Sequence, residues 1–176
     1  ILTVARDLFY RLGIRAIGVD AIAATAGTNK MTLYRHFASK DVLIADCLRA
    51  FAEECRGEWE AFRAEHAPDA EAQLRAWVAY VSELMIKEAD RGCALANAAI
   101  ELPDKDHPAR RVIEAFKTEQ RNQLVLWCSD AGYESSRTDS SDRGVTRGPG
   151  NRAPVQRVAV LICRDRRERL GHPYIE

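Results

Sequence analysis

Residues 19–40, VDAIAATAGTNKMTLYRHFASK, decide the fold of this chain. The first part of the stretch places apolar side chains at the i, i+3, i+4 and i+7 spacing of one helical face, at Val19, Ile22, Ala23 and Ala26. Gly27 follows directly and suits a tight turn, because glycine adopts a positive φ without steric cost. The stretch therefore predicts a short helix that ends in a turn.

A second short helix follows this turn. Asn29 can cap it, because its side-chain oxygen can accept from the free N–H groups of the first turn. Leu33 and Phe37, four residues apart, would hold the helix inward. Its outer face would carry Lys30, Thr32, Tyr34, Arg35 and His36. Two short helices across a tight turn form a helix-turn-helix, whose second helix fits the major groove of DNA. On geometry alone, an ordinary αα-hairpin within a helical bundle is the alternative.

A family resemblance favours the DNA-binding interpretation. Residues 1–43 resemble the N-terminal DNA-binding domain of TetR-type transcriptional repressors, through the segments ILTVARDLFYRLG, VDAIAATAG and TLYRHFASKDVL. A weaker similarity continues through residues 91–116. The resemblance implies an all-α fold, in which a three-helix DNA-binding head is followed by a helical bundle that binds a ligand and dimerises. It also implies a homodimer that reads two half-sites of an operator.

The flanking segments have helical patterns as well. Residues 1–12 carry an uninterrupted apolar stripe, and Gly13 then provides a common helix end. Ser39 can cap a long helix that follows the motif. Pro68 is expected to open the next helix, since proline is tolerated in a first turn. Apolar positions at helical spacing predict that this helix ends near residues 91–92. They also predict a short helix over 93–102 and a last helix from 108 to about 131.

From residue 132 onward the sequence shows no sustained helical or strand period. The resemblance, however, implies two long apolar helices here that pair with a second subunit. One hypothesis is a frameshift near residues 134–136, by mutation or sequencing error. Synonymous codons exist for residues 137–144, RTDSSDRG, such that reading one base later gives the apolar string GLILLIEG. A natural disordered tail is the alternative.

These patterns divide the chain into three parts. We predict a helix-turn-helix DNA-binding domain at 1–43, a helical ligand-binding and regulatory domain at 44–131, and an irregular tail at 132–176. If the tail lacks the pairing helices, dimerisation and tight operator binding would both be lost.

Charge is distributed unevenly, although the formal net charge is zero. Residues 1–40 hold six Lys and Arg against two Asp and Glu, whereas residues 41–130 hold 11 against 18. A basic head on an acidic body suits DNA binding, because neutralisation of phosphates supplies much of the affinity. A chance distribution of surface charge is the alternative.

The five cysteines are odd in number and never form a CxxC pair. Their pattern indicates a reducing cytoplasm and argues against a disulfide framework or a zinc site. We expect no metal and no cofactor, and we expect Cys47 and Cys55 to be small core residues. No run approaches the ~20 apolar residues of a membrane span. The chain opens on Ile1 without a signal-peptide pattern, which indicates a trimmed or incomplete N-terminus.

The candidate DNA contacts lie mainly on the second helix of the motif. Lys30 and Thr32 belong to its N-terminal half, the part that enters the groove in helix-turn-helix docking. Lysine can donate to guanine, and threonine can bond a base edge or meet a thymine methyl. Met31 beside them is either an apolar base contact or a core residue.

The resemblance implies phosphate contacts for Tyr34, His36 and Lys40, which would position the protein rather than read sequence. His36 could instead be a structural residue at the corner after the helix. Arg35 completes the candidate set. The family commonly has Ser or Thr at the position of Gly18, where the hydroxyl caps a helix and touches a phosphate, so glycine here lacks one backbone contact.

The sequence thus predicts a DNA-binding transcriptional regulator, expected to be a repressor, that a small-molecule effector releases from its operator. Such release requires that the effector bind the DNA-incompetent arrangement more tightly. No effector-binding residue is assigned, because aromatic residues at helical spacing are more often ordinary core. The side chains that could build an apolar pocket in the body are Trp59, Phe62, Trp77, Tyr80, Met85, Asn97, Phe116 and Trp127.

Other function classes are less consistent with the sequence. No nucleophile elbow, phosphate loop, HExxH motif or paired carboxylates stand out, so an enzyme is not expected. A helical interaction module without sequence-specific DNA binding, or a defective regulator that lacks its dimerisation helices, is the alternative. Strong salt dependence of duplex binding would separate a DNA-binding protein from an interaction module.

Overall fold

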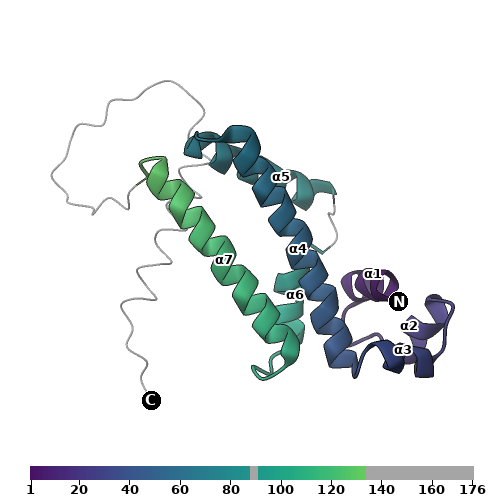
Figure 1. The fold of residues 1–176 in the computed structure, drawn as a ribbon. Coiled ribbons are helices and arrows are strands. Elements are labelled where there is room, and N and C mark those ends of the chain that lie inside the picture. The colour runs from purple at the N-terminus through teal and green to yellow at the C-terminus, as the bar shows by residue number, and fades with distance from the viewer. Residues whose placement is uncertain (88–90, 134–176) are drawn as a thin grey trace, which may run out of the picture. The chain divides into compact units, whose positions relative to one another are not determined.

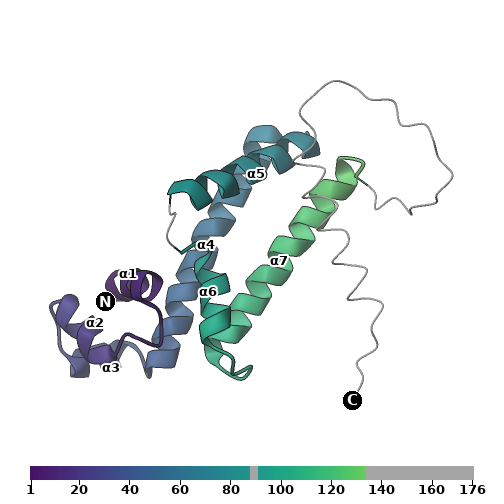
Figure 2. The same cartoon turned by 180° about the vertical axis from the view of Figure 1, so that it is seen from behind.

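The computed structural model describes residues 1–87 and 91–133, and every regular element in that part of the chain is an α-helix (Figures 1 and 2). The predicted all-α fold is therefore confirmed. None of the helices in these ranges is long and apolar enough to cross a membrane. The helices are α1 (Leu2–Leu12), α2 (Val19–Thr25), α3 (Lys30–His36), α4 (Lys40–His66), α5 (Ala70–Lys87), α6 (Ala94–Glu101) and α7 (Pro108–Asp130).

The first three helices gather at the N-terminal end of α4 (Figure 1). α1 ends at Gly13, whose φ of 93° is rarely adopted by other residues. Gly18 is the N-cap of α2, and Gly27, with a φ of 64°, makes the turn into α3. Asn29 caps α3, because its Oδ1 accepts the N–H of Thr32 at 2.9 Å. The predicted helix-turn-helix is present, with its predicted caps.

The same three helices share an apolar core with the start of α4. Ile22, Leu33 and Leu43 are fully buried, one each from α2, α3 and α4. Phe37, which was expected to be core, is only half-buried and forms the C-cap of α3. Burial of one leucine side chain contributes roughly 1.5–3 kcal/mol, so Leu33 is a principal anchor of the short helix α3.

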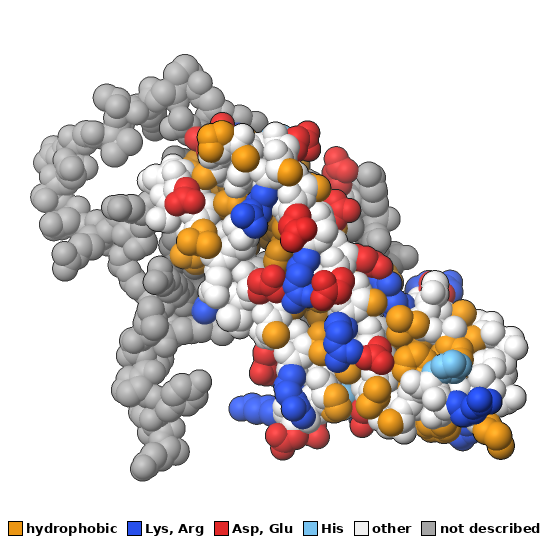
Figure 3. All heavy atoms as spheres, viewed as in Figure 1, with side chains coloured by type: hydrophobic (Ala, Val, Ile, Leu, Met, Phe, Trp, Pro, Cys, Tyr) orange, Lys and Arg blue, Asp and Glu red, His pale blue; other side chains and the backbone are white. Residues whose placement is uncertain are grey.

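α4 begins where the sequence predicts a long helix. Ser39 Oγ accepts the N–H of Val42 at 3.1 Å, which confirms Ser39 as the N-cap. Lys40 is the first residue of this helix rather than a loop residue. Ion pairs one turn apart, Asp46 with Arg49 and Glu53 with Arg56, lie along α4, and Figure 3 shows acidic and basic side chains next to each other on this face.

One predicted helix start was wrong. Pro68 does not open α5 but lies in the turn between α4 and α5. Asp69 caps α5, since its Oδ1 accepts the N–H of Ala72 at 3.0 Å. A carboxylate can satisfy a free N–H group of the first turn, whereas proline has no side-chain acceptor.

The chain forms two compact units. One comprises Ile1–Glu60 and Ser82–Thr118, and the other comprises Ala61–Val81 and, within the described residues, the segment 119–133. In the first unit, the rings of Trp59 and Phe116 stack with centroids 5.0 Å apart. In the second, the core consists of Leu74, Leu124, Trp127 and Cys128, with Trp77 and Tyr133 packed against it.

Two predictions are not tested by this structure. The division into a DNA-binding head at 1–43 and a body at 44–131 concerns function rather than compactness, and it stays a prediction. The frameshift hypothesis and the predicted irregular tail concern residues 132–176. Of these, residues 134–176 lie outside the described part of the structure.

Replacing Gly13 by alanine should destabilise the protein. A Cβ at Gly13 would lie 3.1 Å from Glu101 Oε2, and the φ of 93° with ψ of 149° belongs to a region that is almost exclusively glycine. We expect Gly13→Ala to lower the free energy of unfolding by about 1–3 kcal/mol, measured by urea denaturation.

Gly57→Ala is the matched control. Gly57 lies inside α4, and a Cβ there would meet nothing within 4 Å. Alanine is the better helix former, so this variant should be more stable by about 0.5–1 kcal/mol. A Gly13→Ala variant as stable as the parent would contradict the described geometry of the α1–α2 loop.

Candidate nucleic-acid interface

The short helix α3 has one buried side and one exposed side. Leu33 is fully buried, whereas Met31 is 77% exposed. Met31 is therefore not a core residue. Of the two interpretations, core residue or apolar base contact, only the second is compatible with this exposed position. Tyr34 is 43% exposed, and Arg35 and His36 are exposed as well. The inward Leu33 leaves the predicted contact residues on the accessible side of the helix.

Several polar groups on α3 have no partner elsewhere in the described residues. Neither the Arg35 guanidinium nor the His36 imidazole makes a hydrogen bond or ion pair within residues 1–87 and 91–133. The ring of His36 contacts only its neighbour Phe37, with centroids 6.4 Å apart and tilted rings. These donors are available to an external acceptor.

Lys30 makes a weak contact across the motif. Its Nζ lies 3.1 Å from Asp20 Oδ2 on α2, and both side chains are mostly exposed. Exposed ion pairs of this kind contribute ~0–1 kcal/mol and are screened by salt. Asp20 can therefore be displaced by a stronger anion such as a phosphate.

Lys40 has a structural role that the sequence did not reveal. Its Nζ donates to the carbonyl oxygen of Ile14 at 2.7 Å and lies 5.8 Å from the centroid of the Phe9 ring. Desolvation at this half-buried position lowers the pKa of Lys40. The carbonyl is 26 positions away in sequence, so no local spacing could have indicated this contact.

The remaining cations of α1 are paired with acidic side chains. Arg6 donates two hydrogen bonds to Glu54 of α4, at 2.6 and 2.5 Å. This bidentate contact raises the pKa of Arg6 and holds the pKa of Glu54 below its usual range. Arg11 pairs with Asp7 one turn earlier. Both cations of α1 are thus paired, whereas Arg35 of α3 is not paired within the described residues.

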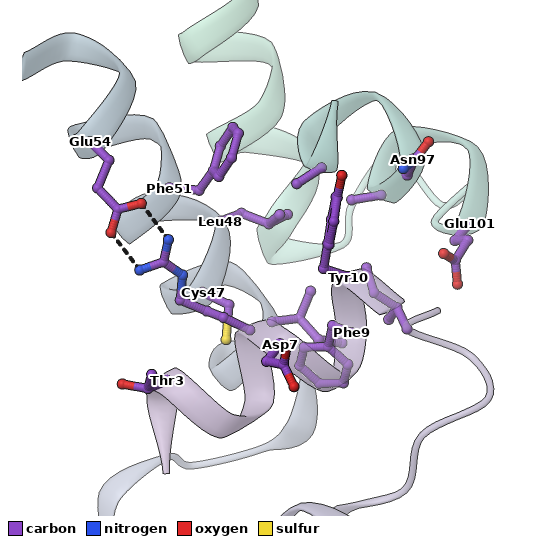
Figure 4. A pocket seen from close by; sticks show the side chains of 15 residues that line it. Thr3, Asp7, Phe9, Tyr10, Cys47, Leu48, Phe51, Glu54, Asn97 and Glu101 are labelled. Atoms are coloured by element: carbon purple, nitrogen blue, oxygen red, sulfur yellow. Dashed lines mark hydrogen bonds and ion pairs between the residues drawn. The ribbon is translucent and has the colours of Figure 1, made fainter. Parts of the chain in front are cut away.

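A cavity of about 410 Å³ lies between α1, α4 and α6 (Figure 4). Its walls include Phe9, Leu48 and Phe51, and polar side chains such as Asn97 and Glu101 also line it. The buried Cys47 thiol lines it too, and burial raises the pKa of Cys47 to about 12. That thiol is protonated at neutral pH and is a poor nucleophile.

Sequence reasoning did not anticipate this cavity. Of the eight body residues named as possible pocket residues, the Met85 side chain lies outside the described part of the structure, and among the other seven only Asn97 lines the cavity. Trp59, Phe116 and Trp127 are instead buried core residues, as aromatics at helical spacing usually are. In the two described ranges, no three His, Cys, Asp or Glu side chains are grouped so that they could hold a metal ion.

Comparisons of sequence agree with the geometry of the N-terminal helices. Residues 1–47 match the family described as bacterial regulatory proteins, tetR family. The chain is 36% identical over 78 residues to the HTH-type transcriptional repressor KstR2 of Rhodococcus jostii (strain RHA1). This match spans 44% of the chain but only 38% of the relative's length.

Solved structures share the fold over most of their length. A TetR-family transcriptional regulator from Streptomyces coelicolor has a TM-score of 0.69 at 24% identity, over 97% of this chain and 94% of that one. The ketosteroid transcriptional regulator KstR2 of Mycobacterium tuberculosis has a TM-score of 0.63 at 24% identity, over 98% and 83%. At these sequence identities, both similarities are similarities of fold. The sequence match to the TetR family of bacterial regulatory proteins thus covers residues 1–47, and over the rest of the chain the likeness to TetR-family regulators is one of fold.

Proposed function

We propose that this chain is a transcriptional repressor that binds double-stranded DNA with α3 in the major groove. The observation that supports this most strongly is the outer side of α3. Exposed side chains there, among them Met31, Arg35 and His36, make no hydrogen bond or ion pair within the described residues, while Leu33 is fully buried. A short helix presented in this way by a preceding helix and a glycine turn is the arrangement that reads DNA in helix-turn-helix proteins.

The N-terminal half of α3 would face the base edges. Thr32 can bond a base edge, and Met31 can contact the methyl group of thymine. Lys30 would exchange its weak contact with Asp20 for guanine or a phosphate. Arg35, one turn after Met31, extends the same exposed side and adds an unpaired positive charge.

The phosphate backbone would be held by Tyr34, His36 and Lys40. These contacts would set the orientation of the head without reading sequence. Lys40 can combine this role with its structural one, because an ammonium group has three N–H donors and Ile14 accepts only one. The proposed head comprises residues 1–43 and the proposed regulatory body residues 44–131.

The proposal includes a homodimer and a small-molecule effector, as the family resemblance implies. A dimer would place two α3 helices on half-sites one helical turn of DNA apart, or a multiple of that distance. The effector would bind a body arrangement that is incompatible with both half-sites, which couples its binding to release of DNA.

The oligomeric state of the purified chain tests the dimer. Light scattering should give the mass of two chains at the concentrations used for duplex binding. The mass of one chain would contradict the dimer and would favour the alternative, a defective regulator without its pairing helices.

Arg35→Ala should weaken binding to a mixed-sequence duplex at low salt. Removing one cation that contacts DNA should also reduce the slope of log affinity against log salt by about one. Fluorescence anisotropy of a labelled duplex across a salt series measures both quantities.

Arg111→Ala is the matched control for this measurement. Arg111 is an exposed arginine of α7, far along the chain from the helix-turn-helix, so its loss should leave the slope unchanged. Equal effects of the two substitutions would indicate binding by general surface charge. Parent binding that does not depend on salt would point instead to an interaction module.

Gly18→Ser should strengthen duplex binding. Gly18 caps α2 with a φ of −88° that any residue can adopt, and a Cβ there would meet nothing within 4 Å. Serine would supply the hydroxyl for a phosphate contact at this helix N-terminus. One such hydrogen bond is worth about 0.5–1.5 kcal/mol, or roughly 2- to 10-fold in affinity. Gly18→Ala fills the same space without a hydroxyl, and a gain of the same size with alanine would contradict the expected contact.

A further inference from the structure

The cavity between α1, α4 and α6 has the size of a small-molecule site. Its volume of about 410 Å³ lies within the range of roughly 300–1,000 Å³ that is usual for such sites. Helices from distant parts of the chain contribute to its wall, and Figure 4 shows Phe51, Leu48 and Tyr10 in the middle of the view, with Glu54 on one side and Glu101 on the other. It is distinct from the outer side of α3.

The wall combines aromatic and aliphatic surface. Phe9, Tyr10 and Phe51 contribute rings, and Leu48 contributes an aliphatic side chain. The Tyr10 hydroxyl donates to the carbonyl oxygen of Gly92 at 3.0 Å, which holds the tyrosine ring in place. Aromatic faces attract organic cations, and Lys40 already lies over the Phe9 ring. The wall therefore suits the apolar part of a ligand, and the rings of Tyr10 and Phe51 can also attract a positive charge.

The charged residues of the wall favour a positive ligand. Three of them, Asp7, Glu54 and Glu101, are acidic, and only Arg6 is basic. Arg6 and Glu54 neutralise each other through two hydrogen bonds, and Asp7 is paired with Arg11. No Lys, Arg or His nitrogen in the described residues lies within 4 Å of the Glu101 carboxylate. Glu101 is therefore the one acidic group of the wall without an ion pair within 4 Å in the described residues, and the Lys40 ammonium acts on it only from a longer distance.

Glu101 also connects the cavity to the DNA-binding head. Its Oε2 accepts the backbone N–H of Arg15 at 3.1 Å. Arg15 belongs to the loop between α1 and α2, which leads directly to Gly18 at the start of the helix-turn-helix. A cation that draws the carboxylate toward the cavity would weaken this bond and loosen the loop that orients α2 and α3.

We propose that this cavity binds an amphipathic organic cation, whose apolar part lies against Tyr10, Leu48 and Phe51 and whose charge pairs with Glu101. Binding competes with the Glu101–Arg15 hydrogen bond and lowers affinity for DNA. This second statement rests on the proposed function, because it assumes that the head binds DNA. The binding of the cation itself does not depend on that assumption.

Calorimetric titration of the full chain tests the binding. The probe is a phenylhexyl trimethylammonium salt, and phenylhexyl alcohol and phenylhexyl sulfate are its neutral and anionic counterparts. We expect one cation per chain, bound at least roughly tenfold more tightly than the alcohol. Equal binding of the three probes, or no saturable binding of the cation, would overturn the proposal.

Two variants locate the site. Glu101→Gln keeps a hydrogen-bond acceptor for Arg15 but removes the charge, and it should weaken cation binding by roughly 5- to 10-fold without affecting the alcohol. Ala94→Phe places a ring in the cavity from the partly exposed start of α6 and should abolish binding of all probes. Glu58→Gln, an exposed carboxylate of α4 that does not line the cavity, is the control and should bind as the parent does.

An unchanged cation affinity in Glu101→Gln would overturn the assignment of Glu101 as the partner of the cation. Circular dichroism shows whether Ala94→Phe folds. If it does not fold, the result for Glu101→Gln decides whether the cavity is the site. Duplex binding is then measured with and without the cation. Release from DNA in the parent but not in Glu101→Gln supports the coupling, and unchanged duplex binding in the parent overturns it. A parent that binds the cation but never binds a duplex would refute the proposed function and leave the cavity site standing.

Discussion

The arrangement of the helix-turn-helix depends on how the loop between α1 and α2 is held. Lys40 at the start of α4 donates to the carbonyl of Ile14, and Glu101 at the end of α6 accepts the N–H of Arg15. Gly13 permits the close approach of Glu101, since any Cβ would crowd its carboxylate. These two side chains thus supply hydrogen-bond partners for the loop backbone from helices outside the motif. The orientation of α2 and α3 is therefore linked to α4 and α6.

This dependence follows from the shortness of α3. Isolated helices shorter than ~12–15 residues are marginal in water, and α3 has only seven. It is maintained by burial of Leu33 and by the Asn29 cap, which is worth about 1 kcal/mol. Because these two residues stabilise the helix, the side chains on its exposed side are not needed to hold it in place. The outer side of α3 can then vary in sequence without loss of the fold.

The local features of this fold could be predicted from sequence, whereas the long-range contacts could not. Asn29, Ser39 and Gly27 act through neighbours a few residues away, so their roles follow from spacing alone. The bond from Arg15 to Glu101 joins positions 86 residues apart, and no periodicity indicates it. The cavity was missed for the same reason, since aromatic residues of the body proved to be core and the cavity wall came largely from α1 and α4.

The proposed function requires that α3 be the surface that contacts DNA. Amide NMR spectra of the isotope-labelled chain, recorded while a short duplex is added at low salt, test this most directly. We expect the largest shifts and broadening on Lys30–His36 and on the N-terminus of α2, with smaller changes in the α1–α2 loop. Shifts confined to α5 or the C-terminal part of α7, or no change on α3 at saturation, would contradict it.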